Sequence, residues 1–391
     1  MIFHLDYETR SRAALKKVGA YRYAEDASTR ILMFAIASET EGPFLWFNPE
    51  FVSTDALSDS RAMAMLEVAF KSPESIIWAH NAEFERALSR YRALPDLGLK
   101  APPIERWRYT AALARRAGLR ASLGNVSEDL NLGQKKWGEG YQLIRLFSIP
   151  QKATGEFTDP LTEGEKFFRF GEYCLQDVRS EKEVHARLKP FELRGATLDT
   201  FLFDARMNDR GLPVNTNALI HAQHIITDLQ NDVAAEFVKL TGLQPTQRDK
   251  VKKFFEKAGL KLANMQSKTL DDAIAYHDEE EDDEMEFDLL NDTPADIRHM
   301  LELYKMVSYA AVKKVRTMLD CVCGDGFIRG MFLYYGAVTG RWSGQKVQPQ
   351  NFKKPTIKDS DGVYDLICKG DSGRGIVRVR VRVRVRVWLG Q

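Results

Sequence analysis

The sequence has few cysteines and no long apolar run, and both absences narrow the class of protein. Only four of the 391 residues are cysteines: Cys174, Cys321, Cys323 and Cys368. Four are too few for a disulfide framework in a chain of this size, and the Cys-Val-Cys segment at 321–323 has no second ligand pair at the spacing of a zinc site. We therefore expect reduced thiols and no zinc. No apolar run can cross a bilayer and no secretion signal begins the chain, so we expect a cytoplasmic protein without a membrane partner.

The formal net charge hides a strong asymmetry along the chain. It is +1, yet the stretch HDEEEDDEMEFD at 277–288 holds nine acidic residues and no Lys or Arg. Without those nine acids the remainder would carry +10, which suits a polyanionic partner such as a nucleic acid. The acidic stretch itself is typical of a solvated loop, and it lacks the glycine and the ligand spacing of a calcium-binding loop.

The first half of the chain alternates strand and helix patterns. Helical periodicity is found at 60–72, 82–94 and 162–188, where Thr162, Glu163 and Glu165 suit a helix start. Strand patterns are found at 2–8, 30–39, 43–48, 74–81 and 104–110, and the polar turn after residue 39 indicates a hairpin. This order predicts an α/β domain with a mixed sheet that ends near residue 195.

The second half is mainly helical and then changes character twice. Residues 200–320 have helical periodicity, including a long amphipathic helix with Asn215 or Asn217 as its cap and Gly242 as its stop. Residues 295–319 predict another long helix. Strand patterns return from about residue 321, and residues 371–391 are a low-complexity Arg-Val segment.

Asp6 and Glu8 interrupt an apolar strand near its end. Side chains two apart on a strand point to the same face, so these two carboxylates stand side by side and repel each other. Two interpretations remain open from these residues alone. A solvated sheet edge tolerates such a pair, and a divalent cation would neutralise it.

Three further stretches bear on that choice. In AHNAEFERAL a strand ends and a helix begins, which is where ligands gather in open α/β sheets; Asn81 would cap this helix, and Glu85 would face the same crevice. In EYCLQDV, Tyr173 and Asp177 are four apart and share a helix face. The stretch ERWRYT at 105–110 either lines a substrate cleft or forms an edge strand. Four clustered carboxylates with oxygen-only ligands would suit two Mg²⁺ or Mn²⁺ ions, which together assist phosphoryl displacement.

At this point the residues resemble a family. HLDYETR, AHNAEFE and YCLQD are similar, in order, to the three motifs of the DEDD 3′→5′ exonucleases, in the subgroup with Tyr four residues before the last Asp. The resemblance implies a ribonuclease H-like domain over residues 1–195, with Asp6, Glu8, Glu85 and Asp177 as metal ligands and catalytic residues. It also implies that Tyr173 orients the attacking water and that Asn81 and Phe84 contact the single-stranded 3′ end. The sequence departs from the family at Glu85, where Asp is usual, and we expect Glu85 to act through water on the second metal.

The resemblance continues into family A DNA polymerases, the group of bacterial DNA polymerase I and its phage relatives. MNDRGLPVN at 207–215 looks like the junction before the thumb, and GAVTGRWSGQKVQPQNFKK at 336–354 looks like the Thr-Gly-Arg segment where the chain enters the palm. The resemblance implies a helical thumb at 200–320, the start of an α+β palm at 321–370, and a monomer that binds primer–template duplex. By this analogy Arg341 contacts the DNA backbone, with Thr339, Gln350 and Asn351 beside it.

The polymerase motifs that the family shows next, an apolar strand ending in Asp and a second metal-binding Asp, do not follow residue 354. Asp371 is a candidate by location only. The Arg-Val alternation at 377–387 holds no carboxylate and is what a short nucleotide repeat gives when translated, which favours a shifted reading frame. We therefore expect exonuclease and DNA-binding functions without polymerisation, in a bacterial or phage-infected cell. Two alternatives stay open: an exoribonuclease of the DEDD class, and a non-catalytic DNA-binding relic.

Overall fold

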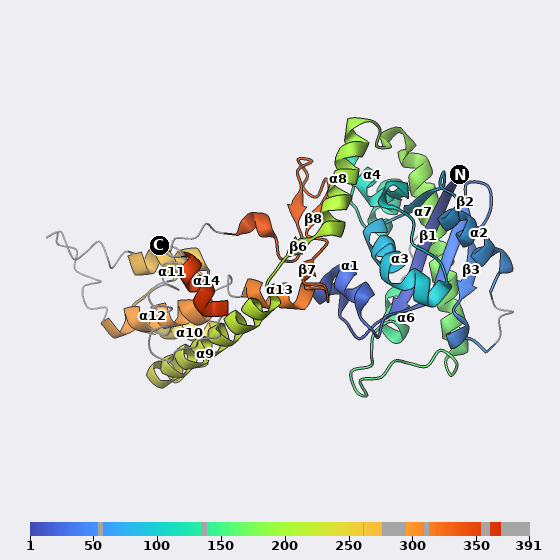
Figure 1. The fold of residues 1–391 in the computed structure, drawn as a ribbon. Coiled ribbons are helices and arrows are strands. Elements are labelled where there is room, and N and C mark those ends of the chain that lie inside the picture. The colour runs from blue at the N-terminus through green and yellow to red at the C-terminus, as the bar shows by residue number, and fades with distance from the viewer. Residues whose placement is uncertain are drawn as a thin grey trace. The chain divides into compact units, whose positions relative to one another are not determined.

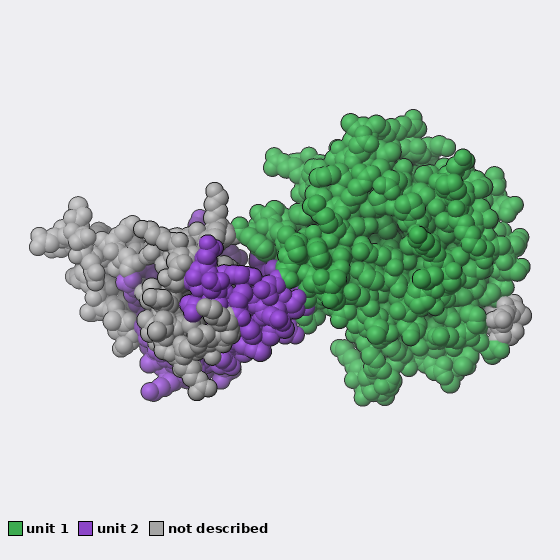
Figure 2. All heavy atoms as spheres, viewed as in Figure 1, with its two compact units in different colours: residues 1–214, 320–352 green, residues 215–319, 353–391 purple. Residues whose placement is uncertain are grey.

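The computed structural model describes residues 1–53, 58–133, 139–260, 262–275, 295–308, 313–352 and 360–368. The acidic stretch at 277–288, Asp371 and the Arg-Val segment lie outside the described residues. The chain divides into two compact units (Figure 2). Unit 1 comprises residues 1–214 and 320–352, and unit 2 comprises residues 215–319 and 353–391. One boundary between the units falls at 214/215 and another at 319/320. The exonuclease, thumb and palm assignments stay predictions.

Unit 1 is built on a five-stranded mixed sheet in the order β3-β2-β1-β4-β5 (Figure 1). The strands are β1 (Ile2–Arg10), β2 (Arg30–Ser38), β3 (Phe44–Phe47), β4 (Ile76–Ala79) and β5 (Trp107–Tyr109). β1 pairs antiparallel with β2 and parallel with β4. The predicted α/β class, the mixed sheet and the hairpin of β2 and β3 are confirmed. β5 is an edge strand, which agrees with one of the two interpretations of residues 105–110.

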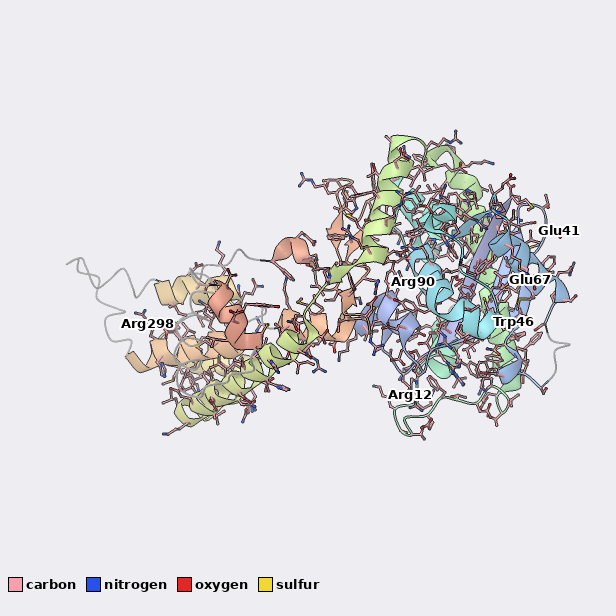
Figure 3. All side chains as sticks on the ribbon, viewed as in Figure 1. Arg12, Glu41, Trp46, Glu67, Arg90 and Arg298 are labelled. Atoms are coloured by element: carbon pink, nitrogen blue, oxygen red, sulfur yellow. The ribbon has the colours of Figure 1, made fainter. Side chains whose placement is uncertain are left out.

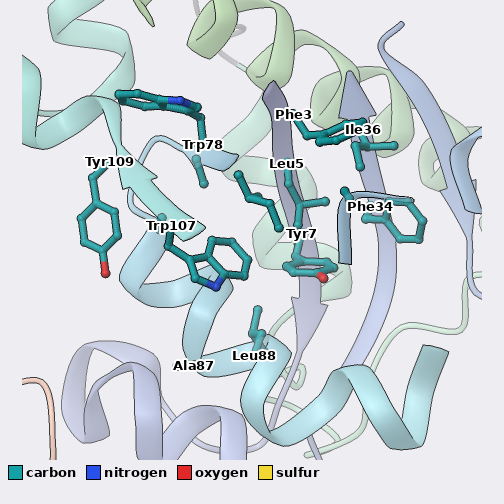
Figure 4. Packing of buried hydrophobic residues seen from close by; sticks show 14 of the residues in the cluster. Phe3, Leu5, Tyr7, Phe34, Ile36, Trp78, Ala87, Leu88, Trp107 and Tyr109 are labelled. Atoms are coloured by element: carbon teal, nitrogen blue, oxygen red, sulfur yellow. The ribbon is translucent and has the colours of Figure 1, made fainter. Parts of the chain in front are cut away.

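Alternation along β1 directs its side chains to two different layers of helices. Phe3, Leu5 and Tyr7 enter a core shared with α2 (Ser60–Lys71) and α3 (Ala82–Leu97), which Figure 4 shows from close by. The opposite face of the sheet packs on α6 (Gly140–Phe147) and α7 (Gly164–Leu188) in a second core. The carboxylates of Asp6 and Glu8 on β1 lie on this second face, because they occupy even-numbered positions.

Several helix ends follow from their sequences. Asp59 caps α2 by accepting a hydrogen bond from the Arg61 amide. α7 begins at Gly164 after Glu163, so the predicted start at Thr162 is wrong. The Thr162 hydroxyl instead donates to the Asp159 carbonyl, which draws it into the preceding turn. The remaining helices of this half are α1 (Leu15–Glu25), α4 (Thr110–Arg116), α5 (Leu123–Asp129) and α8 (Ala196–Arg210).

Unit 2 is helical where the structure describes it. Its long helix α9 (Thr216–Thr241) begins after Asn215, whose side chain accepts from the Ala218 amide, and ends at the left-handed Gly242, as predicted. The predicted single helix over 295–319 is described as α12 (Ala295–Ser308) and α13 (Lys313–Cys321), with residues 309–312 outside the described range. The unit also holds α10 (Arg248–Lys257), α11 (Ser267–Ala275) and α14 (Ser360–Cys368).

The strand signal predicted from residue 321 yields only short strands. They are β7 (Phe327–Ile328), β8 (Phe332–Leu333) and β9 (Ser343–Gly344), and β7 pairs with β6 (Leu212–Pro213). Asn208 on α8 fixes this segment, because its side chain donates to the Phe332 carbonyl and accepts from the Phe332 amide. None of the helices among the described residues is both long and apolar enough to span a membrane.

Candidate metal centre

Asp6, Glu8 and Asp177 lie close together, although 168 residues stand between Glu8 and Asp177 in the sequence. One carboxylate oxygen from each lies within 4.8 Å of the other two. Asp6 and Glu8 come from β1, and Asp177 comes from α7, which crosses the same face of the sheet. Glu8 is buried, and Asp6 and Asp177 are half-buried. Among the described residues, this is the group of three or more acidic, His or Cys side chains with the spacing of a metal site.

Glu85 lies close to this group but is not one of its three members. It belongs to the first turn of α3, which begins just past the carboxyl end of β4. Its side chain is 4% exposed, and its Oε2 is buried without a hydrogen-bond partner. Burial raises the pKa of Glu85 well above its usual range, and the negative charge of Asp6 raises it further. A buried oxygen without a partner, next to another carboxylate, is the environment that a cation would satisfy.

Tyr173 joins the site from α7, one turn before Asp177. Its hydroxyl is hydrogen-bonded to the Asp177 carboxylate. Burial raises the pKa of Tyr173 strongly, and the charges of Asp177, Glu8 and Asp6 add to the rise. Tyr173 is therefore a neutral hydroxyl at ordinary pH, able to donate one hydrogen bond.

Gly140, the first residue of α6, lies directly against the Tyr173 ring. A Cβ added to Gly140 would come within 2.2 Å of a Tyr173 ring carbon. The absence of a side chain at residue 140 thus sets the position of the tyrosine. Sequence reasoning missed Gly140, since nothing in the local pattern links it to a residue on a distant helix.

A buried pair behind the carboxylates connects β1 to α7. His4 Nδ1 lies 2.5 Å from Glu181 Oε2, and both side chains are almost fully buried. His4 is two residues before Asp6 on the same strand face, and Glu181 is one helical turn after Asp177. The pair therefore fixes the strand and the helix that carry the three carboxylates. The same spacing rules that identified Asp6 and Asp177 would have identified this pair.

The expected contacts to a single-stranded end are placed in part. Asn81 occupies the N-cap position of α3 and is exposed, but its side chain makes no capping hydrogen bond, so its predicted capping role is wrong. Its backbone at φ −123° and ψ 59° differs from the extended conformation usual for a cap. Phe84 is half-buried and packs 5.8 Å from the Tyr23 ring. Neither position tests a role in DNA binding.

The residues expected at the duplex lie on an exposed segment of unit 1. Thr339, Arg341, Gln350 and Asn351 are all exposed. Trp342, next to Arg341, is fixed by a 2.7 Å hydrogen bond from its indole N–H to Asp204 on α8. Their contact with DNA stays a prediction.

The donor set fits a hard divalent cation. All the candidate ligands are carboxylates, the ligand type that Mg²⁺ and Mn²⁺ prefer. The partnerless Oε2 of Glu85 adds a structural reason, because its burial is otherwise uncompensated. Asp6, Glu8 and Asp177 would hold such an ion, and Glu85 would face it from α3.

Comparison with known proteins finds a DNA polymerase among the relatives of the chain. No family model matches the chain. Over 373 residues, 94% of its length, the chain is 32% identical to the DNA polymerase of Bacillus phage SP02. The chain is similar to a phage DNA polymerase. It spans about half of that relative, 53% of its length.

A solved structure is also similar, at a lower level. It is the polymerase domain of Pol1 from M. smegmatis in complex with DNA primer-template and dNTP. The identity is 15%, the TM-score is 0.49, and the match covers 86% of this chain and 51% of that one.

Proposed function

We propose that this chain is a metal-dependent 3′→5′ exonuclease acting on DNA, the proofreading and DNA-binding part of a family A DNA polymerase. The observation that carries the proposal is the convergence of Asp6, Glu8 and Asp177 beside Tyr173. The 32% identity to a phage DNA polymerase supports DNA as the substrate. The antiparallel β3-β2-β1 and parallel β1-β4-β5 pairings suit a ribonuclease H-like domain over residues 1–195. The thumb at 200–320 and the palm start at 321–370 belong to the same proposal.

Two Mg²⁺ or Mn²⁺ ions, when bound, would supply an acidified water and charge neutralisation at the phosphate. The residues of the chain have separate tasks. Asp6, Glu8, Glu85 and Asp177 provide the negative charge that holds the cations. Tyr173, whose hydroxyl donates its one hydrogen bond to Asp177, would accept a hydrogen bond from the attacking water. Asn81 and Phe84, which border Glu85, would contact the 3′ nucleotide.

The test is hydrolysis of a 5′-labelled single-stranded DNA by the purified chain with Mg²⁺ or Mn²⁺. We expect a ladder of products shortened from the 3′ end, lost in EDTA and in Asp6→Asn. Asp129→Asn is a matched control, because Asp129 is a surface carboxylate that pairs with Arg120 and is not part of the proposed site. Cleavage by Asp6→Asn at the rate of the unmodified chain would refute the proposal.

The alternatives are separated by two further measurements. The same assay with single-stranded RNA should give slower hydrolysis than with DNA, and the reverse order would favour an exoribonuclease. Titration with Mn²⁺, followed by electron paramagnetic resonance, should show binding that Asp6→Asn weakens. A chain that binds DNA but neither binds Mn²⁺ nor cleaves would be a non-catalytic relic.

A further inference from the structure

Arg10 continues the row of functional side chains on β1. Thr9 bonds through its hydroxyl to Tyr23 in the first core, whereas Arg10 lies against Phe51 in the second core, the layer that also holds Tyr173. Arg10 therefore shares a face with Asp6 and Glu8. Arg10 is two residues after Glu8, which is about 7 Å along the strand. This is comparable with the separation of consecutive phosphates along an extended single strand.

Two aromatic rings hold the Arg10 guanidinium in place. Its central carbon lies 4.1 Å from the centre of the Phe51 ring and 5.0 Å from that of Phe157. Such contacts stabilise the cation through the ring faces and leave its N–H groups, which lie in the guanidinium plane, available for hydrogen bonds. Arg10 is half-buried, so its orientation is restricted before any ligand binds.

The loop that carries Phe157 is fixed to the end of β1 by several bonds. The Ser11 amide donates to the Ser148 carbonyl, and Arg12 donates to the Gly155 carbonyl and to the Glu156 carboxylate, both at 2.6 Å. Figure 3 labels Arg12 beside this loop. Arg12 thus has a structural task, whereas Arg10 does not.

Among the described residues, the Arg10 side chain has neither a hydrogen bond nor an ion pair. Glu50 and Asp159 are the acidic groups whose charge it experiences, and Arg30 adds a positive charge, but neither acid forms an ion pair with it. Five N–H donors on a guanidinium that is already oriented form a site for an oxyanion. Arg61 makes the contrast clear, since it stacks on Phe44 at 4.0 Å in the same way but is bonded to Asp59.

We propose that Arg10 binds one phosphate of the single-stranded substrate, next to the phosphate that is cleaved at the carboxylates. The inference rests on the proposed exonuclease function and adds a substrate-binding residue to it. Arg10 would supply binding that is equal in the ground state and the transition state, and would keep the strand in line with Asp6 and Glu8. The Phe51 and Phe157 rings would hold the guanidinium ready, which lowers the entropy lost on binding.

The test compares Arg10→Ala and Arg10→Lys with Arg61→Ala on a single-stranded oligodeoxythymidine. We expect Arg10→Ala to raise KM on the order of tenfold with kcat within about twofold, and Arg10→Lys to lie between. The dependence of log(kcat/KM) on log[salt] should become shallower by about 0.7, the value for one phosphate on a single strand. Arg61→Ala should behave as the unmodified chain, because Arg61 already has its carboxylate partner.

A second measurement separates phosphate binding from a structural role. Methylphosphonate linkages neutralise single phosphates, so a series of oligonucleotides can place one at each position near the 3′ end. A methylphosphonate at one position should weaken substrate binding by the unmodified chain. The same methylphosphonate should not weaken substrate binding by Arg10→Ala any further. Equal weakening of both proteins at every position, or an unchanged KM in Arg10→Ala, would overturn the inference.

The inference and the proposed function fail in different ways. If the unmodified chain does not cleave, the exonuclease proposal fails, and fluorescence anisotropy of the same oligonucleotides with Ca²⁺ still measures Arg10. Arg10→Ala should then bind the unmodified strand more weakly than the unmodified chain does. Its affinity should not change when the methylphosphonate stands at the position that weakens the unmodified chain. Equal affinities of Arg10→Ala and the unmodified chain would overturn the inference by this route as well.

Discussion

Gly140 positions the Tyr173 ring because it has no side chain of its own. The two residues come from different helices, and the ring occupies the space where a Cβ would stand. Gly140→Ala should displace Tyr173 and with it the hydroxyl beside Asp177. Since small misplacements of a catalytic group are costly, we expect kcat for DNA hydrolysis to fall on the order of 10- to 100-fold.

The matched control for this prediction is Gly133→Ala. Gly133 has no atom within 4 Å of an added Cβ, and the substitution should leave kcat unchanged. Mn²⁺ affinity should persist in Gly140→Ala, because Asp6, Glu8 and Asp177 are not touched. Full activity of Gly140→Ala would show that the ring position does not matter to the reaction.

The residues of the candidate metal centre were predictable to different degrees. The two-residue period of a strand predicts that Asp6 and Glu8 share a face. The turn of a helix predicts the same for Tyr173 and Asp177. The burial of Glu85 Oε2 and the free guanidinium of Arg10 do not follow from spacing, because each depends on side chains brought in by remote elements. A local pattern indicates which groups share a face, but not what covers them.

The His4–Glu181 pair joins the two elements that carry the carboxylates. Removing one partner of a buried pair leaves the other without compensation, which is costly. Glu181→Ala should therefore lower the free energy of unfolding by roughly 3 kcal/mol, measured by urea denaturation. Glu67→Ala is the control, because Glu67 pairs with Lys71 at the surface and should change stability by less than about 1 kcal/mol (Figure 3). Equal losses in the two variants would contradict the role of the buried pair.

Asp204 connects α8 to the exposed segment that bears Arg341. It accepts hydrogen bonds from Trp342 and Asn208. Burial raises the pKa of Asp204 to about 6, although Trp342, Arg86 and Arg115 act to lower it. A raised carboxyl pKa means that the folded chain binds the proton more tightly than the unfolded chain. Its contribution to stability is therefore lost as pH rises through about 6.

Asp204→Asn removes this titration and keeps an acceptor for the Trp342 indole. The free energy of unfolding of Asp204→Asn, minus that of the unmodified chain, should increase by roughly 1 kcal/mol between pH 5 and pH 7.5. Urea denaturation at the two pH values measures the free energies of unfolding of both proteins. The contributions of all other titratable groups cancel when one is subtracted from the other. A difference independent of pH would show that Asp204 titrates normally.

Regular elements with strong periodicity were predicted well, and junctions were not. The α9 helix was placed with its Asn215 cap and its Gly242 stop, since both signals are local. The start of α7 was misplaced because Thr162 is bonded to Asp159 instead of capping the helix. The sequence pattern after residue 321 predicts strands, but the strands that form are only short. Side-chain contacts, such as the hydrogen bond from Asn208 to the Phe332 carbonyl, take the place of long ladders of backbone hydrogen bonds.

At the scale of the whole molecule, charge is the property that the sequence reveals most directly. Nine acids between residues 277 and 288 offset an otherwise basic chain, so its net charge of +1 conceals an excess of basic residues outside that stretch. The division into units was not predictable, because residues 320–352 join unit 1 from a distance of more than a hundred residues along the chain. Local sequence patterns do not indicate that a later segment packs with an earlier domain.

Binding of duplex DNA should depend on the exposed segment and on salt. Arg341 is exposed, and its side chain has no hydrogen bond or ion pair among the described residues, so it is available to a phosphate. We expect Arg341→Ala to weaken duplex binding for all sequences alike and to reduce the slope of log K against log[salt] by about 1. Arg194→Ala is the control, since Arg194 is equally exposed but paired with Glu192. Fluorescence anisotropy with two unrelated duplexes across a salt series measures both effects. A loss confined to one duplex would indicate base contacts, and an unchanged slope would place the phosphate contact elsewhere on the chain.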